Sequence, residues 1–131
     1  MKISGSILNR LAVASILLTG SAQPQTVQQI NIALTNYAFA PDTITMKANT
    51  PYRLHLTNGA SKSHNFSSPE FFAASTVAPE DKSKIEDGVI ELEGGQAVDV
   101  TVTPNRGGTY AVTCTHFMHG MMGMKGQITV Q

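Results

Sequence analysis

Short runs of alternating apolar residues, beginning near position 27, limit what this chain can fold into. The stretch QINIALT, residues 29–35, places Ile30, Ile32 and Leu34 at every second position, with polar or small residues between them. Such alternation is typical of a strand with one buried and one exposed face. Further strands are predicted in TITMKA, PYRLHLTN, GVIELEGGQAVDVTVTP, GGTYAVTC and KGQITVQ. Several short strands at regular spacing predict an all-β sandwich.

Two details of the predicted strands concern individual residues. In PYRLHLTN the alternation puts Leu54 and Leu56 on the buried face and His55 on the other face, where we expect a solvated side chain. In GVIELEGGQAVDVTVTP, the pair Gly94-Gly95 separates two strand-like runs. Glycine pairs are common in tight hairpin turns, so we predict a β-hairpin there.

Residues 67–88 interrupt the strand pattern. No period-2 alternation survives in this stretch, and Pro69 and Pro79 each precede a short helix-compatible run. We interpret the segment as an excursion with one or two helical turns. Phe71 and Phe72 are expected to pack back on the sandwich.

The N-terminus has the pattern of a secretory signal peptide, residues 1–22. Lys2 and Arg10 precede an apolar run over residues 11–18, and small residues up to Ala22 supply a cleavage site. The run is much shorter than the ~20 residues that a membrane-spanning helix needs. We therefore expect export to the periplasm or the exterior, with no membrane span after cleavage.

Cleavage would leave residues 23–131 as one domain, a length that supports a single core. The whole chain carries nine basic and nine acidic side chains, so loss of Lys2 and Arg10 brings the net charge near −2. No basic block remains, which argues against nucleic acid as a partner.

The single cysteine of the chain, Cys114, cannot form an internal disulfide. It begins the stretch CTHFMHGMMGMKG, in which four residues separate it from His119 and four more separate His119 from Met124. Four interpretations are open for an exported thiol: a buried inert group, an intermolecular bridge, a nucleophile or a metal ligand. A nucleophile would need a third residue to orient the histidine, and none is visible.

The neighbours of Cys114 favour the metal ligand. A thiolate, an imidazole and a thioether on one loop suit copper in both oxidation states. A second imidazole is available from His64 in SKSHNF, just after a predicted strand. Taken alone, His64 is better interpreted as a hydrogen-bonded loop histidine.

These residues together resemble the cupredoxins, the family of type 1 or blue copper proteins. The upstream HNF setting, the Cys-x4-His-x4-Met loop, the ending GMKGQITV and the stretch YAFAPDTITMKANT all carry the resemblance. The loop spacing is similar to that of the rusticyanin and auracyanin members. The resemblance covers nearly all of residues 27–131 and implies a Greek-key β-sandwich with one copper ion.

The resemblance also implies roles for individual residues. His64, Cys114 and His119 match the ligands in the copper plane, and Met124 matches the weak axial thioether. Asn65 matches a residue that ties the two ligand-bearing segments together without touching the metal. One departure stands out: relatives often carry Pro-Gly before the loop histidine, where this chain has Phe117-Met118.

The function implied is that of an exported one-electron carrier and not an enzyme. The edge of His119 would be the exit for the electron, and apolar neighbours would form a docking patch for a transient redox partner. We expect a monomer. A multicopper oxidase or nitrite reductase is not expected, because four histidines in one domain cannot also build a multinuclear centre. A binuclear copper site would need a second, bridging cysteine, which the chain lacks.

A copper chaperone or copper-resistance protein is the alternative. His116, Met118, Met121 and Met122 surround His119, and surplus thioethers of this kind could hold a second Cu(I) ion for transfer. The same methionines could instead be packing residues, because methionine fills irregular gaps.

Overall fold

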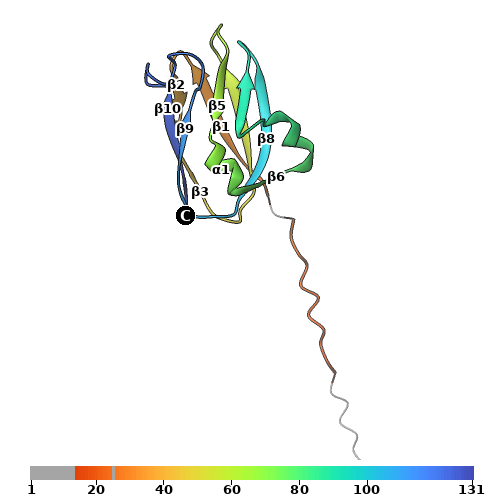
Figure 1. Ribbon diagram of the computed structural model, residues 1–131. Coiled ribbons are helices and arrows are strands. Elements are labelled where there is room, and N and C mark those ends of the chain that lie inside the picture. Colours follow the sequence, from red (N-terminus) through yellow and green to blue (C-terminus); the bar gives the residue numbers. More distant parts are fainter. Residues whose placement is uncertain (1–13, 25) are drawn as a thin grey trace, which may run out of the picture.

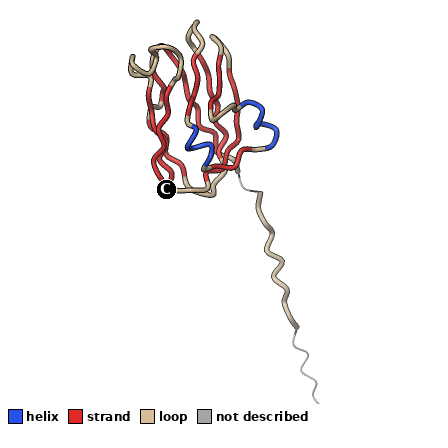
Figure 2. The backbone as a smooth tube through the Cα atoms, viewed as in Figure 1, coloured by secondary structure: helices blue, strands red, loops and turns tan. Residues whose placement is uncertain are grey.

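Two five-stranded sheets form the protein in a computed structural model that describes residues 14–24 and 26–131 (Figure 1). In order across the first sheet lie β2 (Ala38–Ala40), β1 (Gln28–Thr35), β4 (Tyr52–Asn58), β8 (Ala97–Pro104) and β6 (Ser75–Val77). In order across the second lie β3 (Thr43–Met46), β10 (Lys125–Val130), β9 (Gly108–Thr113), β5 (His64–Ser67) and β7 (Val89–Leu92). Strands make up most of the domain in Figure 2. The all-β sandwich is confirmed.

The strand order brings distant parts of the chain together. β1 pairs in parallel with β4, and β10 pairs in parallel with β3. On its other edge β10 pairs antiparallel with β9, the strand that precedes the loop of Cys114. The ends of β5, β9 and β10 consequently meet in one sheet, although β5 and β9 are far apart in sequence.

The core lies between the sheets, as the alternation predicts. Leu54 and Leu56 on β4 are fully buried, and their neighbours Arg53 and His55 face outward. The largest fully buried apolar side chains are Phe66, Phe71, Ile32, Leu34, Met46, Leu54, Leu56, Ile90, Leu92, Met124 and Ile128. Burial of each contributes about 1.5–3 kcal/mol. The fold therefore has an apolar interior that does not depend on a metal ion.

The excursion at residues 67–88 contains one element that the sequence pattern did not predict. The expected helical turns are present as α1 (Pro69–Ala73) and the 3₁₀ helix η1 (Pro79–Lys84). Phe71 and Phe72 are buried, as expected. Between the two helices the short strand β6 adds an edge to the first sheet by pairing with β8. Three residues are too few to display a period-2 signal.

The predicted hairpin at Gly94-Gly95 is wrong. β7 pairs with β5 in one sheet, whereas β8 pairs with β4 and β6 in the other, so the glycines carry the chain between sheets. A Cβ on Gly94 would lie 2.3 Å from the carbonyl oxygen of Ser61, and Gly95 has a φ of 79°. The glycines are thus needed for a close backbone approach and a left-handed residue, not for a hairpin.

His55 is also less solvated than expected. Its Nδ1 lies 2.7 Å from Oδ1 of Asp99 on β8, and Nη2 of Arg53 donates to Oδ2 of the same carboxylate at 2.9 Å. Nearby, Asp81 on η1 accepts from Nζ of Lys84 at 2.6 Å and from the backbone N–H of Thr101 at 2.8 Å. The β8 charge network is the name used below for the set Arg53, His55, Asp81, Lys84 and Asp99.

The chain before β1 has no regular secondary structure over residues 14–24 and extends away from the sandwich (Figure 1). Ile16, Leu17 and Leu18 are 83–92% exposed there. The rest of the predicted signal peptide, residues 1–13, lies outside the described residues, and its cleavage stays a prediction. Among the described residues, no helix has the length and apolar character that crossing a membrane requires.

Candidate metal centre

Three of the four predicted ligands converge at one end of the second sheet. His64 begins β5, Cys114 directly follows β9, and His119 lies in the loop between β9 and β10. The Nδ1 atoms of the two histidines are 3.1 Å apart. Sγ of Cys114 lies 3.9 Å from Nδ1 of His64 and 3.4 Å from Nδ1 of His119. The structure therefore brings these donors together as the sequence predicts.

The spacing of the three atoms suits a metal ion. A triangle with these sides contains a point about 2.0 Å from every corner, close to the bonds of about 2.0–2.3 Å that Zn²⁺ makes to histidine and cysteine. Two imidazoles and one thiol sulfur are a donor set that copper accepts in both oxidation states. His64 and Cys114 are buried and His119 is half-buried, so two of the three donors are shielded from solvent.

Asn36, in the turn between β1 and β2, orients the first histidine. Its Oδ1 lies 2.8 Å from Nε2 of His64, which makes Nε2 the donor of that hydrogen bond. The proton is then on Nε2, and Nδ1 presents a lone pair to the other donors. The ring of Tyr37 stands edge-on to His119, with centroids 5.1 Å apart. Neither Asn36 nor Tyr37 was identified from the sequence.

Asn65 ties the two ligand-bearing segments together, which confirms the role that the family resemblance implies. Its backbone N–H donates to Sγ of Cys114 at 3.4 Å. Its side chain donates to Oγ1 of Thr115 at 2.7 Å and accepts from the N–H of Thr115 at 2.8 Å. The sulfur is thereby held between β5 and the start of the loop.

Met124 is the last residue of the loop, directly before β10. Its side chain is fully buried, its carbonyl accepts from the N–H of Cys114 at 3.2 Å, and its N–H donates to the carbonyl of His119 at 3.1 Å. The backbone of Met124 thus joins both other loop donors. Coordination by its thioether stays a prediction.

The cupredoxin-like domain family matches residues 9–130 of the chain. The chain belongs to this family. A search of the curated proteins finds no match.

Solved structures of auracyanins share the fold. Auracyanin B is 23% identical, with a TM-score of 0.61 over 83% of this chain and 92% of its own. Auracyanin A, described as a "blue" copper protein from the green thermophilic photosynthetic bacterium Chloroflexus aurantiacus, is 19% identical, with a TM-score of 0.59 over 81% and 100%. Dithionite-reduced auracyanin from Roseiflexus castenholzii is 21% identical, with a TM-score of 0.58 over 79% and 97%. At these identities the likeness shows the fold alone.

Burial and nearby positive charges in this cupredoxin-like domain lower the pKa of both site imidazoles, which favours their neutral form. Burial, and then the charges of His119, His116 and Lys62, lower the pKa of His64 below its ordinary value. Burial, and then the charges of His116 and Lys62, lower the pKa of His119. A neutral imidazole has the lone pair that metal binding requires.

The outer part of the loop of this cupredoxin-like domain is apolar and exposed. Phe117 is 88% exposed, Met118 48%, Met121 85% and Met122 56%. The loop is closed by hydrogen bonds within itself, from the N–H of Met122 to the carbonyl of Met118 among them. The interpretation of these methionines as core packing is therefore wrong. Phe117, Met118, Met121 and Met122 are called the loop patch below.

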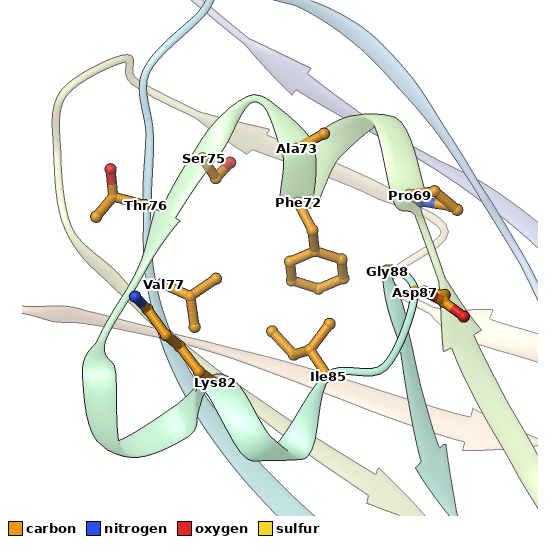
Figure 3. A pocket seen from close by; sticks show the side chains of 10 residues that line it. All are labelled: Pro69, Phe72, Ala73, Ser75, Thr76, Val77, Lys82, Ile85, Asp87 and Gly88. Carbon is orange, nitrogen blue, oxygen red and sulfur yellow. The ribbon is translucent and has the colours of Figure 1, made fainter.

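A separate pocket of about 560 Å³ lies between α1, β6 and η1. Figure 3 shows Phe72, Val77 and Ile85 directed into it, with Lys82 and Asp87 at its rim. None of the predicted ligands lines this pocket. It therefore adds nothing to the metal centre.

Proposed function

We propose that the protein is an exported one-electron carrier that holds one copper ion through His64, Cys114 and His119, with Met124 as a weak axial ligand. The observation that carries the proposal is the convergence of two imidazole nitrogens and one sulfur, with separations of 3.1–3.9 Å, inside a cupredoxin-like sandwich. Bound copper would supply a one-electron redox couple.

The chain's own contribution is to keep the donors in place when the charge of the site changes. Asn36 holds the imidazole of His64, and Asn65 holds the sulfur of Cys114. Both lie on or beside strands that an apolar core supports whether or not a metal is present. Donors fixed in this way move little during electron transfer, which favours fast exchange.

The loop patch is proposed as the docking surface for a transient redox partner. His119 is half-buried and belongs to the same loop, so its ring joins the buried donors to the exposed patch. Contiguous exposed apolar side chains mark interaction sites, whereas single exposed apolar residues are normal on any surface. Methionine side chains repack readily against partners of different shape. We expect a monomeric protein with no catalytic activity of its own.

Periplasmic or secreted localisation is part of the proposal. It rests on the signal-peptide pattern of residues 1–22. Mass spectrometry of the protein from its native cell fraction should find a chain beginning at Gln23. A chain that still begins at Met1 in the soluble cytosolic fraction would contradict export.

The visible spectrum of the Cu(II)-loaded protein tests the carrier hypothesis. Charge transfer from the Cys114 thiolate should give an intense visible band that bleaches on reduction and returns on oxidation. The Zn²⁺-loaded protein, which has the same donors but no redox chemistry, is the matched control and should be colourless. A colourless Cu(II) form with stoichiometric copper bound would show that the site is not type 1.

Copper handling, as a chaperone or resistance protein, is the second candidate. The observation that favours it is the exposure of Met118, Met121 and Met122, whose thioethers are available to an ion arriving from solvent. Thioethers prefer Cu(I), so this role predicts a second Cu(I) site on the loop. The stoichiometry of Cu(I) binding separates it from the carrier.

A further inference from the structure

Glu91, on β7, connects the exposed loop to the interior of the metal centre. One of its carboxylate oxygens, Oε2, lies 2.9 Å from Nε2 of His116. The other, Oε1, accepts from Nδ2 of Asn65 at 2.7 Å. Asn65 and Glu91 are directly opposite each other in the β5–β7 pairing, so the backbone register places the carboxylate at this point. Nothing in the sequence pattern indicates this bridge.

The bridge leads to the sulfur of Cys114. Asn65 donates one side-chain N–H to Glu91 and the other to Oγ1 of Thr115, and it donates its backbone N–H to the sulfur. A charged acceptor polarises the side-chain amide of Asn65 and strengthens the hydrogen bond that the oxygen of this amide accepts from the N–H of Thr115. The carboxylate is therefore linked through one residue to the segment that carries Cys114, and the same residue bonds to the sulfur through its backbone N–H.

The bridge also anchors the loop. In the described part of the chain, three side chains between Thr115 and Gly123 hydrogen-bond to residues outside the loop: those of Thr115, His116 and His119. Thr115 and His119 contact the donors themselves. His116, through Glu91, is the contact that ties the outer loop to the sheet.

We infer that Glu91 is a positioning residue of the copper centre, which anchors the loop through His116 and whose negative charge favours the oxidised metal. The inference rests on the proposed function. Oxidation adds one positive charge to the site, and a nearby carboxylate stabilises that charge more than the reduced state. The side chain of Glu91 is 61% exposed, so solvent and salt weaken the effect without removing it.

Three variants separate the charge from the anchor. Glu91→Gln removes the charge but keeps an amide of the same shape that can still hydrogen-bond to both neighbours. Glu91→Ala removes charge and anchor together. His116→Ala removes the anchor and leaves the carboxylate. Glu93→Gln is the matched control, because Glu93 is exposed, has the same charge two residues along, and makes no side-chain hydrogen bond to the loop among the described residues.

Two readouts at fixed neutral pH test the inference. The first is the reduction potential of the copper protein, which we expect to rise in Glu91→Gln and Glu91→Ala, and not in His116→Ala. The second is amide hydrogen exchange of the metal-free protein at His119, Met122 and Gly123. Exchange there should become about two- to fivefold faster in Glu91→Ala and His116→Ala, a size typical of the loss of one half-exposed polar contact.

The outcomes distinguish this inference from the proposed function. If wild-type protein lacks the visible band, the carrier hypothesis fails, and the exchange experiment on metal-free protein still tests the anchor. If the band is present but Glu91→Gln shifts the potential no more than Glu93→Gln does, the electrostatic part is wrong. Unchanged loop exchange in both Glu91→Ala and His116→Ala would overturn the anchor.

Discussion

The metal centre and the β8 charge network are both clusters of polar groups, but they are organised in opposite ways. In the network each carboxylate faces donors: Asp99 lies between Arg53 and His55. In the metal centre three groups with lone pairs, on His64, Cys114 and His119, face one another. The network members pair acceptors with donors, whereas the centre directs three lone-pair donors toward one point.

The pKa shifts express the same contrast. Hydrogen bonds from Arg53 and His55 lower the pKa of Asp99, which stabilises the charged form beside an opposite charge. In the centre, burial and then the charge of His119 lower the pKa of His64, which disfavours the charged form. A cluster that stabilises its own charges needs no ligand, and a cluster that keeps its bases neutral is prepared to bind a cation.

Substitution of Cys114 should show the largest difference between the two regions, because it should affect copper binding and leave the fold intact. Cys114→Ser should abolish the visible band of the Cu(II) protein, because a hydroxyl does not supply the thiolate charge transfer. Circular dichroism should show an unchanged sandwich, since the strands do not depend on the metal. A retained band would mean that another group provides the colour.

Asp81 should show the reverse behaviour. Asp81→Asn should leave the band intact but lower the free energy of unfolding by about 1–3 kcal/mol, because it removes the buried, charged acceptor of Lys84 and Thr101. Urea unfolding of the copper-free protein measures the loss. Asp99→Asn, at a more exposed carboxylate, is the control and should cost less.

The contribution of Asp81 should also depend on pH. Burial alone would raise its pKa, but hydrogen bonds from Lys84 and Thr101 outweigh burial and lower it. A carboxyl whose pKa is lower in the folded state stabilises the protein above its unfolded pKa of about 4 and loses that effect as pH falls through the folded value. The stability difference between wild type and Asp81→Asn should therefore shrink below about pH 4. A difference that stays constant down to pH 2 would contradict the ion-pair explanation.

Substitution of Met124 at the axial position should have a smaller effect, a shift of the reduction potential whose sign depends on the new side chain. Met124→Gln should lower the reduction potential and Met124→Leu should raise it, because an amide oxygen favours Cu(II) more than a thioether does. We expect each shift to approach about 59 mV, a tenfold change in the relative affinity for the two oxidation states. The same substitutions at the exposed Met121 should shift the potential much less. A larger shift at Met121 would reassign the axial ligand.

The smallest effect is expected from the loop patch. Titration with Cu(I) against a competing chelator should stop at one ion per chain. A combined Met118→Leu, Met121→Leu and Met122→Leu variant should give the same endpoint. A second ion in the wild type that disappears in this variant would favour copper handling over electron transfer.

The core and the converging donors could be predicted because each leaves a local pattern in the sequence. Alternation marks the buried face of β4, and the spacing of Cys114, His119 and Met124 marks one loop. The assignment of His64 as a ligand depended on the family resemblance, because its neighbours in sequence do not show which strand ends it will lie beside in the fold.

Asn36 and Glu91 could not be predicted because their partners are distant in sequence. Asn36 meets His64, and Glu91 meets His116, only after strands of the sandwich have been ordered. The hairpin at Gly94-Gly95 was wrong for a related reason: a glycine pair fits a tight hairpin and a passage between sheets equally well. Strand order, which no local pattern encodes, decides between them.

The position of β10 between β3 and β9 has a consequence for how the protein folds. β10 separates β3 from β9 and hydrogen-bonds to both, although β3 is synthesised some eighty residues earlier. Until residues 125–130 are in place, β3 and β9 have no partner on the edge that β10 occupies. Closure of the loop that carries Cys114, His119 and Met124 is therefore coupled to a pairing between segments far apart in sequence, which folds slowly.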